Sequence, residues 1–446
     1  MSRRDALQIG ADARNKAARD ALSIYRAGVE AVRADAVLGR TISIQGPNLR
    51  LGALTFRREA YRRIVLLGAG KASAAMAGAA EDILGDWVTD GLVVTREGHG
   101  EDLRRVRTLF AGHPVPDEGS LAAGRAMAEL AGGMTSDDLA IVLLSGGASA
   151  LLELPVAGID LDHLRATNTA LLRCGATIDE VNAVRRCLSR IKAGGLTRLL
   201  APARIVCLVL SDVLGDPLSV IGSGPCWTES SSAPSGLATM ERYGLEQELP
   251  QPVVSRLRQA QPPSDSGPPV DHIIVGNIRT AVDAARARAA ELGYTPAVLT
   301  AAMEGEARVI GALAGAMVRD RPWTLESSPV NCLIMGGETT VTVRGSGIGG
   351  RCQEFACAAM RSLSGVEDAA LLVAGTDGTD GPTDAAGALI DGRSLDLALG
   401  QGLTPEQALA ANDTYTFLNA ADSLIRTGPT GTNVGDLVIG LLAPSA

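Results

Sequence analysis

Apolar runs that end at glycine- or aspartate-rich turns constrain the fold of this chain more than any other feature. The runs and their turns are 63–67 with Gly68-Ala69-Gly70-Lys71, 139–144 with Ser145-Gly146-Gly147-Ala148-Ser149, and 205–210 with Ser211-Asp212. Continuous apolar strands that alternate with helical patterns are typical of a parallel sheet covered on both faces. Ligands bind such sheets beyond the carboxyl ends of the strands. The sequence therefore predicts an α/β fold with a ligand site at these turns.

One stretch without strand patterns interrupts the alternation of strands and helices, and this interruption predicts two domains. Residues 226–271 are rich in serine and proline and are typical of a linker that holds one or two short helices. We therefore expect one α/β domain over residues 1–245, a linker to about residue 270, and a second α/β domain over residues 271–446. Within them, a helix is expected over 3–39 and a strand over 340–343. A cleft between two such domains is the expected place of the site.

Composition excludes several classes of protein. The formal net charge of −9 leaves no basic excess for nucleic-acid phosphates. The seven cysteines show no Cys-x-x-Cys pair, which indicates reduced thiols in a cytoplasmic protein. No run of 18 apolar residues is present, so no membrane span is expected. A small-molecule substrate is the expected partner, and a homo-oligomer stays open.

Two of the turns have the composition of anion sites. Gly68 and Gly70 occupy two positions of a dinucleotide fingerprint whose third position is Ser73, and Lys71 adds a charge next to a helix start. The other interpretation is a tight turn with a solvated lysine. The turn Ser145-Gly146-Gly147-Ala148-Ser149 suits a phosphate or carboxylate equally well, or it is simply a close helix–strand connection. The Gly-x-Ser-x-Gly elbow of serine hydrolases is absent.

Asp212 follows the third apolar run directly. A carboxylate at the end of a strand can bind a metal ion or accept a hydroxyl proton. The alternative is a helix cap or a turn residue. Asp216, which precedes a proline, fits the role of turn residue better.

The last third of the chain carries a second charged cluster. Glu338 and Thr339 follow two glycines, Arg351 follows two more, and Asp377 and Asp380 lie in a glycine-rich acidic turn. Such turns bring backbone N–H groups and carboxylates close to a small charged ligand. Arg351 at a helix start suits bidentate contact with a carboxylate or phosphoryl group, or else a surface ion pair with Glu354. Together these residues predict a site for an anionic, phosphorylated and metal-bound substrate.

The order of these motifs resembles the class II glycerate 2-kinase (MOFRL) family. The motifs include Gly-Ala-Gly-Lys-Ala-Ser, Gly-His-Pro-Val-Pro-Asp, Ser-Gly-Gly-Ala-Ser-Ala-Leu, Ser-Asp-Val-Leu-Gly-Asp, Gly-Gly-Glu-Thr-Thr-Val, Gly-Gly-Arg-x-Gln-Glu and Gly-Thr-Asp-Gly-Thr-Asp-Gly-Pro-Thr-Asp. The resemblance extends from about residue 12 to about residue 442. The pieces at 336–354 and 375–388 are its most specific parts.

The resemblance implies a fold, a reaction and a residue set. It implies a Rossmann-like parallel-sheet N-terminal domain, a smaller MOFRL-type α/β C-terminal domain and an active cleft between them. It implies ATP-dependent phosphorylation of the 2-hydroxyl of D-glycerate with a divalent cation such as Mg²⁺. Lys71, Asp212 and Arg351 fall on the family's active-site positions. Cys352, Cys187 and Gly435 depart from its pattern, where Asn, His and Asn are common.

A second class of enzyme remains as the alternative. An NAD(P)H-dependent hydroxypyruvate reductase would use Gly68 and Gly70 for the pyrophosphate and an acid such as Glu97 for the ribose. Ser73 at the third glycine position and the lack of an evident His/Asp proton relay count against it.

Overall fold

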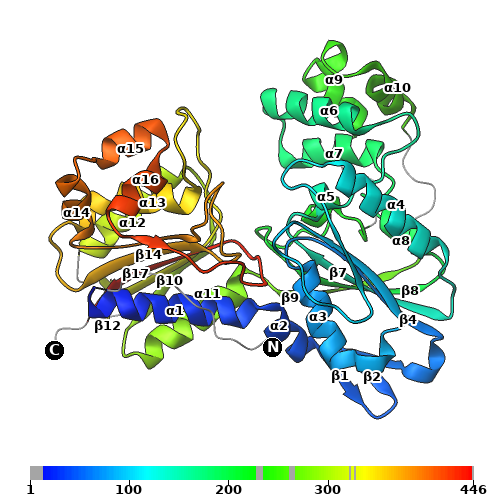
Figure 1. Ribbon diagram of the computed structural model, residues 1–446, viewed down its shortest axis with the longest axis horizontal. Helices are drawn as coiled ribbons and strands as arrows, with labels where there is room; N and C mark the ends of the chain where they lie inside the picture. The colour runs from blue at the N-terminus through cyan, green and yellow to red at the C-terminus, as the bar shows by residue number, and fades with distance from the viewer. Residues whose placement is uncertain (1–13, 228–234, 261–266, 321–322, 326–327, 444–446) are drawn as a thin grey trace. The chain divides into compact units, whose positions relative to one another are not determined.

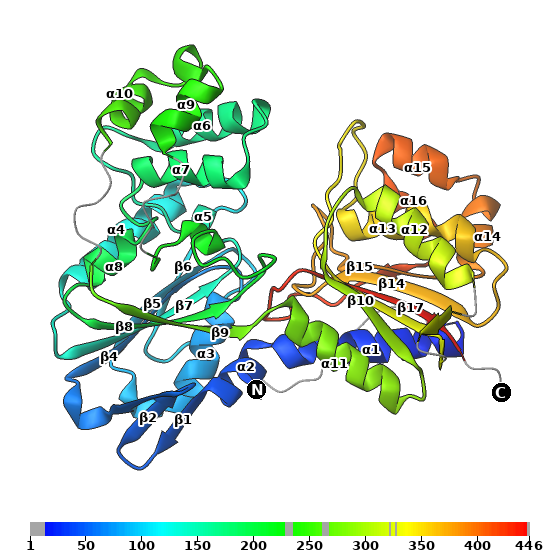
Figure 2. The same cartoon turned by 180° about the vertical axis from the view of Figure 1, so that it is seen from behind.

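The computed structural model describes residues 14–227, 235–260, 267–320, 323–325 and 328–443, which form two compact units (Figures 1 and 2). The central unit covers residues 37–275, and the terminal unit combines residues 14–36 with residues 276–443. Each unit contains its own six-stranded sheet.

The sheet of the central unit is doubly wound. Its strand order is β6 (Arg107–Phe110), β5 (Asp90–Thr95), β4 (Arg63–Ala69), β7 (Asp138–Ser145), β8 (Arg204–Leu210) and β9 (Val270–Gly276). The pairs from β6 to β8 are parallel. The first strand of the sheet along the chain is β4, and β5 and β6 are added on one side of it. The chain then returns to the other side of β4, where it forms β7 and β8. The order therefore reverses between β4 and β7, which is where ligands bind in Rossmann-type sheets.

Helices cover both faces of this sheet, so β7 is buried over its whole length and β4 and β8 are buried except at their first residues. Figures 1 and 2 show α3 (Ser73–Leu84) on one face and α4 (Glu118–Gly132) and α8 (Gly195–Leu200) on the other. The helix α5 (Ala148–Leu151) follows β7 directly. A small antiparallel sheet of β1 (Ile42–Gln45), β2 (Asn48–Leu51) and β3 (Leu54–Arg57) follows α2 (Ala34–Thr41). Short 3₁₀ turns occur at 58–60, 85–87, 221–223 and 245–247.

Four helices form a lobe at one end of the central unit (Figure 1). They are α6 (Leu161–Arg173), α7 (Ile178–Leu188), α9 (Gly236–Arg242) and α10 (Gln251–Gln259). Leu171, Val184, Leu188, Val253 and Leu257 are among the buried residues of its own apolar core. The serine- and proline-rich stretch of the sequence is therefore more than a linker, because α9 and α10 lie within it and pack in this lobe.

The terminal unit has a mixed sheet. Its strand order is β10 (Pro296–Met303), β13 (Cys332–Gly337), β17 (Asp436–Leu442), β14 (Ala369–Gly375), β15 (Gly387–Asp391) and β16 (Leu424–Ile425). Only β10 and β13 pair in parallel; the other pairs are antiparallel. A separate hairpin is formed by β11 (Trp323–Leu325) and β12 (Ser328–Val330).

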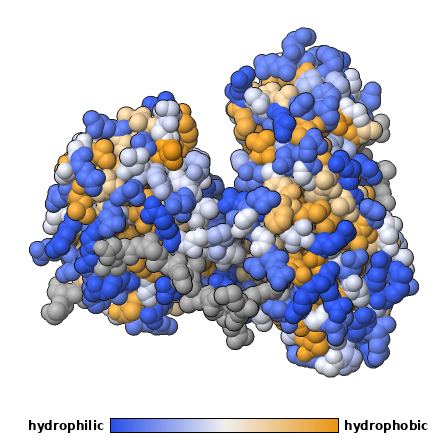
Figure 3. All heavy atoms as spheres, in the orientation of Figure 1, coloured by the Kyte–Doolittle hydropathy of each residue, from blue (hydrophilic) through white to orange (hydrophobic). Residues whose placement is uncertain are grey.

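Helices also cover both faces of the second sheet. In both views, α1 (Lys16–Val32) and α11 (Ile278–Glu291) lie on one face. The opposite face carries α12 (Ala307–Arg319) and α13 (Arg351–Leu363), followed by α14 (Ser394–Gly400), α15 (Pro405–Ala411) and α16 (Thr414–Ala420). Polar and apolar residues mix over the face seen in Figure 3. None of the described helices has the length and apolarity that crossing a bilayer requires.

The structure draws the domain boundaries differently from the sequence interpretation. Residues 14–36 pack in the terminal unit, and β9 joins the sheet of the central unit rather than opening the second domain. The expected helix over 3–39 is divided at Arg33, which has extended backbone angles, and residues 1–13 lie outside the described residues.

The strand expected over 340–343 is not formed, which corrects that expectation. Thr340 makes a single bridge to Glu306, and β13 ends at Gly337. The apolar–polar alternation is strand-like, but both edges of β13 are already paired with β10 and β17. The Thr342 amide and hydroxyl instead donate to the Glu306 carboxylate, both at 3.0 Å.

Candidate functional site

The turn after β4 is closed against the turn after β7. The Lys71 N–H donates to the Gly146 carbonyl at 2.8 Å, and the Ala72 N–H donates to Ser145 Oγ at 3.0 Å. A Cβ on Gly70 would lie 2.2 Å from Ser145 Oγ, and the φ of +132° at Gly70 also favours glycine. The two turns at the switch point of the sheet are therefore one connected structure.

The backbone amides of the turn after β4 all have hydrogen-bond partners within the protein. The Gly70 N–H donates to the Val94 carbonyl and the Ser73 N–H to the Gly70 carbonyl. Gly68 lies within β4, where a Cβ would meet the Leu143 carbonyl at 2.6 Å. The geometry thus gives Gly68 and Gly70 a packing role and argues against their predicted contact with a cofactor pyrophosphate. The Lys71 side chain is half-exposed.

The turn after β7 lies against the Lys71 and His113 side chains. Gly147 has a φ of +85° and precedes α5, whose first amides have no intrahelical partner. A Cβ on Gly147 would lie 3.0 Å from His113 Nε2 and 3.4 Å from Lys71 Cγ. Gly147 therefore lets the Lys71 and His113 side chains come close together over this turn.

Ser149 belongs to a hydroxyl network. Its Oγ lies 2.8 Å from Ser223 Oγ, which donates to Asn182 Oδ1 at 2.9 Å. Ser145 Oγ accepts the Ala72 N–H, so Ser145 joins the two turns. Both hydroxyls have structural contacts, and Ser149 also borders a pocket.

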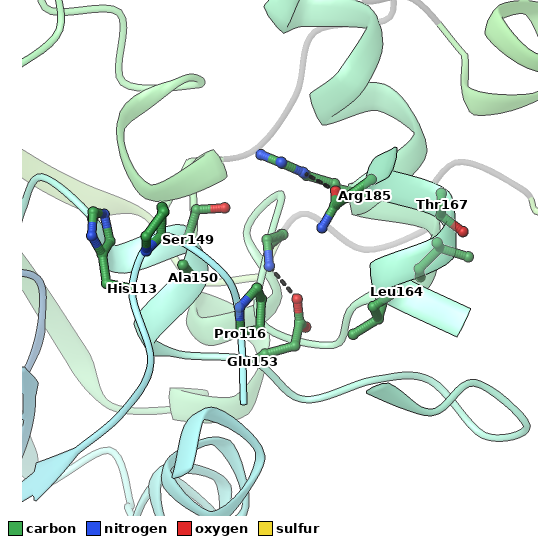
Figure 4. Close-up of a pocket in the computed structure, with 13 residues that line it drawn as sticks. His113, Pro116, Ser149, Ala150, Glu153, Leu164, Thr167 and Arg185 are labelled. Carbon is green, nitrogen blue, oxygen red and sulfur yellow. Dashed lines mark hydrogen bonds and ion pairs between the residues drawn. The ribbon is translucent and has the colours of Figure 1, made fainter. Parts of the chain in front are cut away.

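That pocket has a volume of about 190 Å³ and lies between the β7 turn and the helical lobe (Figure 4). Gly147, Ser149 and Ala150 form one wall, and residues of α6 and α7 form another. Glu153 and Lys192, both almost completely buried, form an ion pair in its lining. Arg185 from α7 donates through Nε to Asn168 Oδ1 on α6 at 2.8 Å.

Asp212 follows β8 after one residue and is half-exposed. The preceding Ser211 is buried, and its Oγ lies 3.3 Å from the Val213 amide. Asp216 has a φ of +54°, and its amide donates to the Val213 carbonyl. Asp216 is thus the turn residue, as expected, and the Asp212 carboxylate sits at the carboxyl edge of the sheet.

Arg351 is the first residue of α13 in the terminal unit, and its guanidinium is fully engaged. Nε and Nη2 donate to the Asp436 carboxylate at 2.6 and 2.9 Å, and Nη1 pairs with Glu338 at 2.7 Å. Burial opposes its charge, but Asp436 and Glu338 outweigh burial and raise the pKa of Arg351. The alternative pair with Glu354 does not form, because Glu354 binds Arg308 at 2.8 Å.

Asp380 holds the start of α13. Its carboxylate accepts the Cys352 amide at 3.2 Å and the Gln353 amide at 2.9 Å. A Cβ on Gly350 would lie 2.3 Å from Asp380 Cγ, so glycine is needed there. Burial and the nearby Asp436 raise the pKa of Asp380 to about 7, although the two amides and Arg351 act in the opposite direction. Asp380 is therefore placed to position Arg351 through its helix.

The other predicted residues of this unit have separate surroundings. The buried Asp377 accepts the amide and hydroxyl of Thr379 at 3.0 and 3.1 Å. Asp384, the third acid of the turn, is exposed and pairs with Arg426. Glu338 is exposed beside Arg351, whereas Thr339 is buried. The three carboxylates of the acidic turn thus avoid mutual repulsion by facing different partners.

Sequence reasoning missed part of the pocket. Glu153, Asn168 and Arg185 carry no motif, and their approach depends on how α6 and α7 pack. A doublet of arginines at 185–186 was the only signal.

Comparison of the sequence with known protein families and proteins identifies the family of this chain. Residues 20–258 match the model of a domain of unknown function, DUF4147, and residues 331–436 match the model of the MOFRL family. A relative named D-glycerate 2-kinase, from Thermotoga maritima, is 40% identical over 95% of this chain and 97% of its own length. The chain belongs to the class II glycerate 2-kinase (MOFRL) family.

Two further similarities bear on this family's chemistry. A crystal structure of glycerate kinase from Thermotoga maritima matches with a TM-score of 0.80 and 39% identity, over 95% of this chain and 99% of that chain. A relative from Agrobacterium vitis named putative hydroxypyruvate reductase is 40% identical over 84% of this chain and 86% of its own length. Both a kinase and a reductase name therefore occur among similar proteins.

The departures from the glycerate 2-kinase pattern lie around the charged residues. Cys352 is buried on α13, where burial and Asp436 raise its pKa. Gly435 has a φ of +99°, and its carbonyl accepts the amide and hydroxyl of Thr376. Cys187 is half-buried on α7 with its Sγ 3.4 Å from the Ala183 carbonyl. None of the three replaces Lys71, Asp212 or Arg351.

Proposed function

We propose that this protein transfers the γ-phosphoryl group of ATP to the 2-hydroxyl of D-glycerate and forms 2-phosphoglycerate. The observation that carries the proposal is the 40% identity to the D-glycerate 2-kinase of Thermotoga maritima over nearly both chains. From the resemblance of the motifs we assign the reaction to Lys71, Asp212 and Arg351. Phosphoryl transfer depends mainly on positioning and on neutralisation of charge, which these residue types supply.

The three residues divide the work by their chemistry. Lys71 contributes positive charge to the transferring phosphoryl group. Asp212 accepts the proton of the 2-hydroxyl. The hydroxyl oxygen of glycerate then bonds to the γ-phosphorus, and the bond between the γ-phosphorus and ADP breaks. We assign to Arg351 the stabilisation of negative charge, with Glu338 as its exchangeable partner. Glu338 fits this role because it is exposed, whereas the other partner, Asp436, is buried.

A magnesium ion fits the residues only together with the nucleotide. Within the described ranges, no group of three or more His, Cys, Asp or Glu side chains could hold a metal ion. Mg²⁺ commonly uses one or two carboxylates with substrate phosphates, and when bound it neutralises phosphate charge. We propose Asp212 as the carboxylate of this chain that holds it, which is the alternative to its role as base.

The reductase is the second candidate because similar proteins carry that name. It would need the amides of the β4 turn for the pyrophosphate of a dinucleotide. The amides of Gly70, Lys71, Ala72 and Ser73 all have partners within the protein, which favours the kinase.

An enolase-coupled assay tests the proposal. The purified protein is mixed with D-glycerate and MgATP, and separately with hydroxypyruvate and NADH. We expect a direct enolase signal, because enolase accepts 2-phosphoglycerate, and no oxidation of NADH. A signal that needs added phosphoglycerate mutase would instead assign the transfer to the 3-hydroxyl. NADH oxidation without phosphorylation would replace the kinase by the reductase.

A further inference from the structure

The pocket between the β7 turn and the helical lobe has the size and charge of a site for a small acid. Its volume of about 190 Å³ is below the roughly 300–1,000 Å³ that is typical of drug-sized ligands. A three-carbon hydroxy acid fits in this volume.

The charges lining the pocket favour an anion. Glu153 and Lys192 neutralise each other in their buried ion pair. Arg185 then leaves one uncompensated positive charge among the described lining residues. Burial lowers the pKa of Arg185, and Glu153 partly opposes this. A partly buried cation whose charge is only partly offset is costly, and a bound carboxylate would lower that cost.

The orientation of the Arg185 side chain also suits contact with a carboxylate. Its only hydrogen bond within the described part of the chain runs from Nε to Asn168 Oδ1. The fork of two terminal nitrogens therefore has no protein partner there, and Figure 4 shows the guanidinium held above the pocket. A guanidinium fork matches the two oxygens of a carboxylate. The bond to Asn168 fixes its orientation from the neighbouring helix.

The rest of the lining suits the hydroxyls of such an acid. Ser149 places a hydroxyl group in the wall, and Asn168 adds an amide, whereas the Thr167 hydroxyl donates to the His163 carbonyl. Gly147 forms the side nearest the Lys71 and His113 side chains. An acid whose carboxylate meets Arg185 would thus present its other end toward Lys71, the group assigned to the phosphoryl.

We propose that this pocket is the subsite for the hydroxy acid and that Arg185 binds its carboxylate. The inference deepens the proposed kinase function and rests on it for the identity of the acid. Arg351 is then not needed for the carboxylate of the acid, because two of its nitrogens already donate to Asp436. We keep its assignment to the phosphoryl group.

The test measures binding and kinetics in the full-length protein. Calorimetric titration with D-glycerate, and with uncharged glycerol as a probe of the carboxylate, is applied to the wild type, Arg185→Gln and Arg185→Lys. Loss of a desolvated charge pair costs about 2–5 kcal/mol, which is roughly a 30-fold or greater rise in Kd. We expect that rise for glycerate in Arg185→Gln, a smaller one in Arg185→Lys, and no measurable glycerol binding in any of the proteins.

Kinetic constants give the second readout, with Arg190→Gln as the matched control. Arg190 is exposed, lies two residues beyond α7 and does not line the pocket. We expect KM for glycerate to rise in Arg185→Gln while KM for ATP stays within twofold, and both to stay unchanged in Arg190→Gln. Thermal unfolding of each variant confirms that it is folded before titration.

The two proposals fail in different ways. If the wild type phosphorylates glycerate and Arg185→Gln binds it with unchanged Kd and KM, the pocket assignment is wrong and the kinase function stands. If the wild type binds glycerate through Arg185 but transfers no phosphoryl group, the pocket stands and the kinase function is wrong. A wild type that binds neither glycerate nor other small hydroxy acids at millimolar concentration overturns the pocket assignment.

Discussion

At the scale of single residues, the contacts of Arg351 predict what its replacement would do. Asp436 is buried and receives two hydrogen bonds from the guanidinium. Lysine keeps the charge but cannot make both contacts, so we expect Arg351→Lys to lose nearly as much activity as Arg351→Ala. Removing one partner of a buried ion pair costs about 3–5 kcal/mol, so Arg351→Ala should also be the less stable variant. Activity assays and urea unfolding check both expectations. Recovery of most activity by lysine would mean that only the charge matters.

Lys71 gives a cleaner prediction, because its backbone and side chain have separate roles. The backbone N–H joins the two turns, and alanine retains it. We therefore expect Lys71→Ala to lower kcat/KM about 100-fold or more, since one preorganised contact to a transition state contributes roughly 3 kcal/mol. The melting temperature should change little. Lys16→Ala, at an exposed lysine of α1, is the matched control. Near-normal activity of Lys71→Ala would make Lys71 a solvated turn residue.

Residue types and their order pointed to Lys71, Asp212 and Arg351 as candidates, but not to the partners of these side chains. Asp212 and Asp216 were assigned to a strand end and a turn, and the structure places them so. Asp436, which pairs with Arg351, and Arg185 were missed. Each meets its partner only through tertiary packing, since Asp436 lies 85 positions from Arg351, and Arg185 lies 17 positions from Asn168 on another helix.

At the scale of elements, Asp380 links the acidic turn to the start of α13. Protonation of Asp380 should therefore change the free energy of unfolding. Its pKa of about 7 lies above the ordinary value of 3.8. Between these values the folded state keeps a proton that the unfolded state has lost. The contribution of Asp380 to stability is therefore fully present below about pH 4, falls as pH rises, and is constant above about pH 7.

This sign predicts how Asp380→Asn compares with the wild type. The variant lacks the titration, so the stability advantage of the wild type should be larger at pH 5 than at pH 8. Urea unfolding of both proteins at the two pH values measures it. An advantage that grows with pH would mean that the α13 amides and Arg351 keep Asp380 ionised in the folded protein. Asp384→Asn, at an exposed acid of the same turn, controls for the change of residue type.

Strands and helices were easier to predict than their ends. Apolar runs predicted β4, β7 and β8 within a few residues, because buried parallel strands need uninterrupted apolar sequence. The false strand over 340–343 had the right alternation but no free sheet edge. Sheet edges are occupied by segments distant in sequence, so pattern alone cannot tell whether a strand will find a partner.

At the scale of the whole molecule, the N-terminal helix completes the terminal unit. α1 packs on α11 and on the face of β14 and β17. The Tyr25 hydroxyl, fully buried, donates to the Gly375 carbonyl at 2.7 Å, directly before the acidic turn. Burial and the neighbouring Cys352, Asp377 and Asp436 raise the pKa of Tyr25, so it stays a neutral donor. Sequence order placed this helix in the first domain, because chain proximity is the only guide when nothing marks the far partner.

Tyr25→Phe tests this arrangement. The change removes one hydrogen bond and leaves the ring, so we expect a loss of about 1 kcal/mol. The loss should appear as faster amide hydrogen exchange in β14 and β17, whereas β4 and β7 of the central unit keep their protection. Tyr243→Phe is the reciprocal control, because its hydroxyl donates to Glu180 at 2.9 Å within the helical lobe. Exchange that rises equally in both sheets would mean that the two units unfold as one cooperative structure and that α1 does not belong to the terminal unit alone.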